Sequence, residues 1–181
     1  TVGCVNGTAT ALARDLGPEL TSGSIDGVYA FPHPYGCSQL GDDHETTRHL
    51  LAGLLRHPNA GGVLVLGLGC ENNTMEEFKH VAEPYDQARV RFLVSQDVDD
   101  EYEVASGLLR ELAQFAQHDV RKAASASQLC VGLKCGGSDA YSGVTANPVL
   151  GLLAERLVAQ GGTALMTEVP EMFGAERSLM N

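Results

Sequence analysis

The sequence has no tryptophan, few aromatic residues and few basic ones. Only 6% of its 181 residues are aromatic, and 12 Lys and Arg stand against 23 Asp and Glu, which gives a formal charge of -11. A charge of this sign opposes the phosphate backbone of nucleic acids and the surface of anionic membranes. Nucleic acid and membrane are therefore not expected as partners.

Long hydrophobic runs and targeting segments are also missing from the sequence. No apolar run approaches the roughly 20 residues of a membrane-spanning helix, and no basic start followed by a hydrophobic run marks a secretory signal. The five cysteines are odd in number and widely spaced, which favours reduced thiols over a disulfide framework. We therefore expect a soluble protein of the cytoplasm.

Several common catalytic signatures are absent. The sequence contains no Gly-x-x-x-x-Gly-Lys-Ser/Thr phosphate loop, no paired Cys-x-x-Cys zinc motif and no Gly-x-Ser-x-Gly nucleophile elbow. Gly67 and Gly69 match the first two glycines of a dinucleotide-binding loop, but Asn72 stands where the third would be. Classical NTPases, zinc fingers and serine hydrolases are therefore set aside.

The apolar residues, 44% of the chain, are arranged as short runs that alternate with longer stretches of helical periodicity. This alternation predicts an α/β fold with an open, mostly parallel, Rossmann-like sheet of about six strands and helices on both faces. We expect one domain over residues 1–181, in which the small, polar residues 121–127 form a connector. The expected strands are residues 2–6, 27–32, 62–68, 89–96, 128–134 and 163–168. The expected helices are residues 8–16, 43–57, 74–81, 100–118 and 146–160, and one from about residue 170.

Four cysteines recur at a spacing that matches one β-α unit. Cys4, Cys37 and Cys70 lie 33 residues apart, and Cys135 lies 65 residues further on. Each follows the apolar run of its unit, and parallel strands deliver their carboxyl ends to one edge of a sheet, where ligands bind. A single such cysteine is more often a small buried hydrophobe. Four at corresponding positions predict a shared site, whereas Cys130 is assigned to the core.

The richest chemistry lies in residues 33–45, which read HPYGCSQLGDDHE. A thiol, two imidazoles and three carboxylates within this stretch could bind a metal or move a proton. Asp42 or Asp43 also suits the first turn of the following helix, so part of the pattern has a purely structural explanation. His33 and His44 bracket the loop and are the better candidates for chemistry.

Residues 33–45, together with residues 57–62, 67–73, 136–139 and 167–176, closely resemble the altronate dehydratase and galactarate dehydratase family. The resemblance covers most of the chain and is to the middle domain of that family. Its full-length members add an N-terminal β-rich domain and a C-terminal domain, so we expect a fragment of a longer chain, inactive alone. The form CSQLGDDHE resembles altronate dehydratase more than galactarate dehydratase.

The resemblance implies a hydro-lyase that uses Fe(II) to dehydrate a sugar acid, D-altronate, to 2-dehydro-3-deoxy-D-gluconate. Three alternatives stay open: a galactarate dehydratase, a relative of the sulfolactate sulfo-lyases, and a non-catalytic scaffold whose parent carries the chemistry elsewhere. Expected partners are the sugar-acid substrate and the other domains of the parent chain, and a homo-oligomer is left open.

Dehydration requires a base beside a carboxylate, a cation or strong donors for the developing enediolate, and an acid for the leaving hydroxyl. We expect His33 or His44 as the base, because imidazole titrates near neutrality. Asp139 or Glu168 could act as the acid if burial raised its pKa.

The remaining candidates are metal ligands and substrate contacts. The metal ligands that we nominate are Cys37, Cys70, Cys135 and His44. Lys134 and Arg48 are candidate anchors for the substrate carboxylate, although either could equally be an ordinary surface charge. The polar side chains that could bind the substrate's hydroxyls are Ser38, Gln39, Asn72, Asn73, Ser138 and Asn147.

Overall fold

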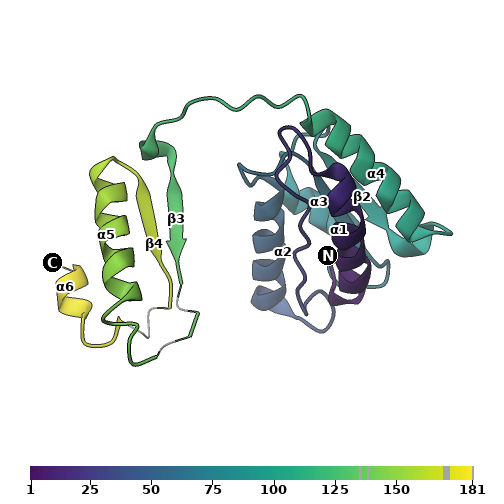
Figure 1. Cartoon of the computed structure of the whole chain (residues 1–181). Helices are drawn as coiled ribbons and strands as arrows, with labels where there is room; N and C mark the ends of the chain where they lie inside the picture. Colours follow the sequence, from purple (N-terminus) through teal and green to yellow (C-terminus); the bar gives the residue numbers. More distant parts are fainter. Residues whose placement is uncertain (135, 138, 169–171, 181) are drawn as a thin grey trace. The chain divides into compact units, whose positions relative to one another are not determined.

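The computed structural model describes residues 1–134, 136–137, 139–168 and 172–180. Contacts between residues divide the chain into two compact units, Thr1–Arg121 and Lys122–Asn181. Figure 1 shows them in purple to teal and in green to yellow. We expected one domain over residues 1–181, and the division falls inside the segment that we interpreted as a connector. Each unit is described by itself below.

Unit 1 contains a two-stranded parallel sheet and four longer helices. Its elements are η1 (Gly3–Val5), α1 (Asn6–Leu20), α2 (Gly41–Leu55), β1 (Val63–Gly67), α3 (Met75–Ala82), β2 (Val90–Val94), η2 (Ser95–Asp97) and α4 (Glu101–Ala116). Strand β1 pairs with β2 in parallel, with Val63 opposite Val90 and Gly67 opposite Val94.

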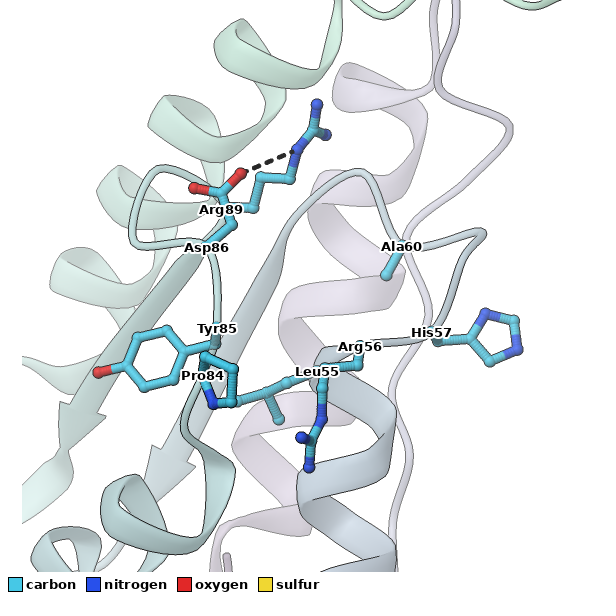
Figure 2. A pocket seen from close by; sticks show the side chains of 8 residues that line it. All are labelled: Leu55, Arg56, His57, Ala60, Pro84, Tyr85, Asp86 and Arg89. Atoms are coloured by element: carbon cyan, nitrogen blue, oxygen red, sulfur yellow. Dashed lines mark ion pairs between the residues drawn. The ribbon is translucent and has the colours of Figure 1, made fainter.

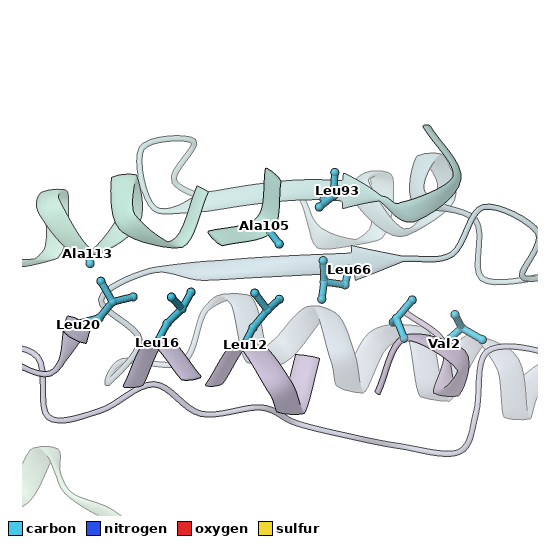
Figure 3. Packing of buried hydrophobic residues seen from close by; sticks show 9 residues of the cluster. Val2, Leu12, Leu16, Leu20, Leu66, Leu93, Ala105 and Ala113 are labelled. Carbon is cyan, nitrogen blue, oxygen red and sulfur yellow. The ribbon is translucent and has the colours of Figure 1, made fainter. Parts of the chain in front are cut away.

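Hydrophobic clusters cover both faces of this sheet. On one face, Leu12 and Leu16 of α1 meet Leu66 of β1, Leu93 of β2 and Ala105 of α4 (Figure 3). On the other face, the buried residues come from α2, the sheet and α3: Ala52, Val65, Phe78, Ala82 and Val90. Successive strand residues point to opposite faces, which explains why Val65 and Leu66 belong to different clusters.

Unit 2 is smaller and has little buried surface. It contains η3 (Ala126–Gln128), β3 (Cys130–Leu133), α5 (Ala146–Ala159), β4 (Thr163–Met166) and α6 (Glu176–Met180). Strand β3 pairs with β4 in parallel, with Cys130 opposite Thr163. Leu157 of α5 is its one buried hydrophobic residue among those described.

The expected six-stranded sheet is wrong: the described residues form two separate two-stranded sheets. The expected strand over residues 2–6 is a 3-10 turn followed by the start of α1. Val2 and Val5 are buried three residues apart, which fits a helical turn as well as a strand. Residues 27–32 form no strand, and Tyr29 and Phe31 are exposed.

The other four expected strands and the helices exist with shifted ends. Helix α1 continues to Leu20 with Pro18 inside it, whereas we expected it to stop at residue 16. Helix α4 is capped by Asp100, whose side chain accepts the backbone N–H of Glu103 at 2.9 Å. None of the helices formed by the described residues is long and apolar enough to cross a membrane.

Candidate functional site

Three loops of unit 1 meet beyond the carboxyl end of β1, and each carries a cysteine. Cys4 lies in η1, Cys37 in the loop before α2, and Cys70 in the turn after β1. The backbone N–H of Gly3 donates to the Tyr35 carbonyl at 2.9 Å, and that of Asn73 donates to the Gly36 carbonyl at 3.2 Å. These bonds tie the segments that contain the three thiols to one another.

The pKa of the Cys37 thiol is influenced by both of the other thiols. Burial raises the pKa of the Cys37 thiol, and the nearby Cys4, Cys70 and Glu71 raise it further, while an N–H bond donated by Asn72 lowers it. Cys4 and Cys70 are exposed, and all four described cysteines are free. The loops that carry Cys4, Cys37 and Cys70 are thus neighbours, although only Cys70 follows a strand, and a site shared by the thiols stays a prediction.

A glycine directly precedes each of these three cysteines, and two of the glycines adopt a positive φ. Gly36 has a φ of 106°, and a Cβ built there would lie 2.7 Å from the Cα of Val2. Gly69 has a φ of 124°, and its Cβ would lie 2.7 Å from Oε1 of Gln96. Only glycine combines this backbone conformation with so close an approach. The Gly-Cys pairs therefore allow the thiol-bearing loops to pack together.

Glu71 closes the turn after β1 and was not among the predicted site residues. Its carboxylate accepts the N–H groups of Leu68 at 3.0 Å and Gly69 at 2.6 Å, and the Thr1 hydroxyl at 2.7 Å. Burial raises the pKa of this carboxyl, but the hydrogen bonds outweigh that effect and set the pKa below its ordinary value. In the sequence, the feature that could have pointed to Glu71 is its position directly after Gly69 and Cys70.

Arg48 and Asn73 form a buried connection between α2, α3 and these loops. Arg48 is 6% exposed; its Nε donates to Oδ1 of Asn73 at 3.0 Å, and its other nitrogens bond Glu45 at 2.9 Å and Glu77 at 2.6 Å. Asn73 is fully buried, and its Nδ2 donates to the Thr1 carbonyl at 3.3 Å.

This geometry corrects two candidates. Arg48 is neutralised by two carboxylates instead of being free to anchor a substrate, and the Asn73 side chain does not reach the surface. Both residues instead position the helices and loops around the thiols.

The two candidate imidazoles differ in their neighbours. His33 is half-buried, burial lowers its pKa, and its Nδ1 accepts the backbone N–H of Tyr35 at 3.2 Å. Its neutral ring therefore carries hydrogen on Nε2 and presents a donor. Nε2 of His44 lies 3.4 Å from Nη2 of Arg48, which can only donate, so this nitrogen is also an acceptor.

The polar substrate candidates of unit 1 are more accessible than Asn73. Ser38 and Asn72 are exposed, and Ser38 has a φ of 64°. Gln39 is half-buried; its Nε2 donates to the Asp43 carbonyl at 3.4 Å, and its Oε1 is a buried acceptor without a partner. These three side chains could accept or donate hydrogen bonds to a hydroxylated ligand.

Unit 2 contains the remaining candidates. Lys134, Asp139, Asn147 and Glu168 are exposed in unit 2 taken by itself, and the acid role expected for Asp139 or Glu168 stays a prediction. Oδ1 of Asp139 instead accepts N–H groups of Tyr141 at 2.8 Å and Ser142 at 3.0 Å.

Three further cysteine and serine predictions concern unit 2. Cys135 and Ser138, predicted as a metal ligand and a substrate contact, lie outside the described residues. Cys130 is exposed on β3, where we expected it in the core. Side chains alternate along a strand, and the described residues of unit 2 leave that face of β3 exposed.

A single metal ion finds no ready ligand set here. Across the described ranges of both units, no three His, Cys, Asp or Glu side chains are grouped so that they could hold one metal ion. His44 lies beside Arg48, and Cys135, another of the four nominated ligands, lies outside the described residues. The nominated set of Cys37, Cys70, Cys135 and His44 therefore stays a prediction, and the described residues by themselves do not form a mononuclear Fe(II) centre.

Two hollows of unit 1 are lined by residues outside the loops that carry the thiols. Figure 2 shows one of about 470 Å³ between the end of α2 and the segment before β2, at the amino ends of the strands. Arg89 lies there and pairs with Asp86 at 3.5 Å. A second, of about 570 Å³, is lined by α3 residues with Val94 and Asp97 at the carboxyl end of β2. Neither hollow is lined by a residue that we nominated.

Unit 1 thus has the parallel strands and covering helices of α/β proteins, in which ligands are commonly bound beyond the carboxyl ends of the strands. The family model described as "D-galactarate dehydratase/Altronate hydrolase, second domain" matches residues 1–117. The model described as "D-galactarate/Altronate dehydratase, C-terminal" matches residues 126–181. The chain belongs to this galactarate and altronate dehydratase family.

The chain is 53% identical to the altronate dehydratase of Bacillus subtilis over 99% of its length and 50% identical to that of Escherichia coli over all of it. It spans 36% and 37% of the lengths of these two relatives. It is also 33% identical to the (2R)-sulfolactate sulfo-lyase subunit beta of Chromohalobacter salexigens, over 87% of the chain and 40% of that protein. No solved structure matches the chain.

The second match corrects one part of the sequence interpretation. We took the whole chain for the middle domain and expected the C-terminal domain to be missing, whereas residues 126–181 match the C-terminal model. The boundary between the two matches agrees with the division between the two units.

Proposed function

We propose that this chain is part of a hydro-lyase that removes water from D-altronate and gives 2-dehydro-3-deoxy-D-gluconate. The identity of 50–53% to two altronate dehydratases over essentially the whole chain carries the proposal. Identity to the sulfo-lyase subunit is 33% and to the galactarate dehydratase of Escherichia coli 36%, and both alignments cover less of the chain. Altronate is therefore favoured over galactarate and sulfolactate.

Polar groups near the thiols support binding of a hydroxylated acid. Ser38, Gln39 and Asn72 are accessible or half-accessible in the loops that carry Cys37 and Cys70. We assign them to the substrate's hydroxyls, together with Ser138 and Asn147, and Lys134 to its carboxylate. The free thiols suit a reducing compartment, so we place the reaction in the cytoplasm.

Proton transfer is proposed for His33 ahead of His44. Burial lowers the pKa of His33 and keeps its ring neutral near pH 7, whereas the ring of His44 faces a guanidinium. In the described tautomer Nε2 of His33 donates, so His33 can act as a base only when its Nδ1 is released from the Tyr35 N–H. Asp139 and Glu168 remain proposed as donors to the leaving hydroxyl. We keep iron as the proposed metal and assign it no catalytic step.

The test compares three acids with the protein expressed at its full encoded length. With Fe(II) and reductant added to the protein, we expect a higher kcat/KM for D-altronate than for galactarate or sulfolactate. His33→Asn should lower kcat on altronate by about 10²–10⁴-fold, the range of general acid–base catalysis. His49→Asn, on the exposed side of α2, is the matched control.

Two results would contradict the proposal. Preferential turnover of galactarate or sulfolactate would replace the substrate. Unchanged altronate turnover by His33→Asn and His44→Asn together would indicate the scaffold alternative, in which the parent's chemistry lies outside this chain.

A further inference from the structure

The side-chain amide of Asn6, the first residue of α1, forms two hydrogen bonds with the backbone of His33. Its Nδ2 donates to the His33 carbonyl at 2.9 Å, and its Oδ1 accepts the His33 N–H at 3.3 Å. A backbone N–H only donates and a carbonyl only accepts, so a single orientation of the amide fits both bonds. Among the described residues, no backbone group bonds the N–H or the carbonyl of His33. The amide of Asn6 therefore holds this residue in place.

The loop around His33 is tied down on both sides of Pro34. The N–H of Gly3 donates to the Tyr35 carbonyl at 2.9 Å, so the segment that begins α1 bonds the backbone of both neighbours of Pro34. A Cβ at Gly3 would lie 3.0 Å from the His33 carbonyl oxygen, which shows how closely the two segments pack. Between these ties, Nδ1 of His33 accepts the Tyr35 N–H at 3.2 Å. The ring of His33 is therefore oriented within a loop whose backbone Asn6 and Gly3 fix.

The sequence His-Pro occurs twice in unit 1, and the second copy shows what the amide of Asn6 replaces. Nδ1 of His57 accepts the N–H of Asn59, also at 3.2 Å. The backbone of His57 is held by other backbone groups: its N–H donates to a carbonyl in the last turn of α2 at 3.2 Å, and its carbonyl accepts the N–H of Ala60 at 2.9 Å. At His33 the amide of Asn6 supplies both the donor and the acceptor instead.

We propose that Asn6 is a positioning residue that holds His33 as a hydrogen-bond donor, with the ring hydrogen on Nε2. The hold rests on the two bonds of the amide; its use in dehydration rests on the proposed function. With Nδ1 engaged by an N–H, a neutral imidazole carries its one hydrogen on Nε2. Asn6 thereby opposes the release of Nδ1 that a base role of His33 would require.

A fixed donor has a definite use in the proposed reaction. Removal of a proton beside a carboxylate places negative charge on a substrate oxygen, and a donor that is already oriented stabilises this charge. In this role Nε2 of His33 keeps its hydrogen, and no proton passes through the ring. Ser38 and Gln39, which we assign to the substrate's hydroxyls, belong to the same loop between α1 and α2.

The burial of His33 suits a neutral donor. The side chain is half-buried, and burial lowers its pKa, which keeps the ring uncharged near pH 7. Enzymes use neutral imidazoles in this way to polarise a substrate oxygen.

The first test measures the ring tautomer of His33 in the protein at its full encoded length. Histidine is labelled with 15N in the ring, and the signals of His33 are identified by their loss in His33→Asn. Near pH 7 we expect a protonated Nε2 and an unprotonated Nδ1. A hydrogen on Nδ1, or a positively charged ring, would overturn the proposal before any change at Asn6.

The second test replaces Asn6 with aspartate, which has nearly the same size. Asn6→Asp keeps an oxygen for the His33 N–H but sets a second acceptor against the His33 carbonyl. We expect a mixture of the two tautomers and a kcat on D-altronate about 10–10²-fold lower, the cost of a misplaced group. KM should stay nearly unchanged, because the lost bond is made in the transition state. An acidic residue suits the first turn of a helix, so α1 should remain folded, which circular dichroism checks.

The matched control makes the same change at the second His-Pro sequence. Asn59 is exposed, and Asn59→Asp keeps the backbone N–H that bonds His57. This variant should change neither the tautomer of His33 nor kcat. The ring of His57 should keep its hydrogen on Nε2 in every variant and serves as the internal reference.

A double-mutant comparison separates positioning from a general effect on the fold. In the His33→Asn background, Asn6→Asp should lower kcat by less than about twofold, because Asn6 acts through His33. Equal losses with and without His33 would show that Asn6 supports the fold alone and would overturn the proposal. A higher kcat in Asn6→Asp would show that His33 works as a base once Nδ1 is released, which also contradicts it.

The positioning role and the proposed function fail in distinguishable ways. If D-altronate is dehydrated and Asn6→Asp changes neither the tautomer nor kcat, the function stands and the role of Asn6 is refuted. If Asn6→Asp shifts the tautomer of His33 but no sugar acid is converted by the unaltered protein, the hold on His33 stands and the proposed function fails.

Discussion

Units 1 and 2 each contain a two-stranded parallel sheet, yet they differ sharply in what covers it. In unit 1 the strands are sandwiched between α1 and α4 on one face and α2 and α3 on the other. In unit 2, Val149, Leu152 and Val158 of α5 and Leu165 and Met166 of β4 are exposed. Exposed apolar surface of this kind marks faces that pack against other protein. Unit 1 therefore carries its own core, whereas unit 2 has little core of its own.

Removing one large apolar side chain from each unit tests this difference in burial. Phe78→Ala should lower the free energy of unfolding of unit 1 by about 3–5 kcal/mol, because Phe78 is 1% exposed and leaves a cavity. Leu153→Ala in α5, where the side chain is 47% exposed, should cost clearly less. Urea unfolding followed by hydrogen exchange of each segment measures both. Equal losses would show that the core of unit 2 is better formed than its burial indicates.

Within unit 1, the buried contacts of Arg48 should contribute more to stability than an exposed ion pair. Arg48→Met should lower the free energy of unfolding by about 1–3 kcal/mol, because it leaves the buried Oδ1 of Asn73 without its hydrogen-bond donor. Arg110→Met removes an exposed ion pair, in which Nε of Arg110 lies 2.7 Å from Oε1 of Glu19. This variant should change the midpoint of thermal unfolding little. The Arg48 variant should also loosen the loop of Cys37, visible as faster labelling of its thiol. Unchanged labelling would limit Arg48 to joining α2 and α3.

The smallest expected effect is the pH dependence contributed by Glu71. Its pKa is lowered in the folded state, so the unfolded chain takes up the proton first as the pH falls. Stability of unit 1 should therefore decline below about pH 4.3, the ordinary value of a glutamate. Glu71→Gln should flatten this decline in acid titrations followed by circular dichroism, whereas Glu76→Gln, at an exposed position, should not. An equal slope in both variants would assign the decline to other carboxyls.

The sequence predicted the helices and the paired strands well, because their periodicity is long or bounded by clear turns. It failed at residues 2–6 and 27–32, where short apolar runs fit several structures. Cys4 and Cys37 were placed near Cys70 for a reason that does not hold, since neither follows a strand. The repeated glycine before each cysteine was the sounder signal.

The roles of Arg48 and Asn73 could not be predicted from the sequence. Whether a guanidinium is free or paired depends on which helices pack together. Arg48 is paired here with Glu77, which lies 29 residues further along the chain. The same is true of Glu71, whose hydrogen bonds depend on the turn that it closes. Pairings of this kind follow from tertiary packing, which local pattern does not specify.

The φ of 106° at Gly36 restricts this position to glycine. Any side chain there would press on the segment around Val2 and move the loop of Cys37 away from that of Cys4. In protein engineering, exposed positions of α2 are therefore better places for substitution than the residue before Cys37. That residue has to remain glycine for the loops of Cys4 and Cys37 to stay in contact.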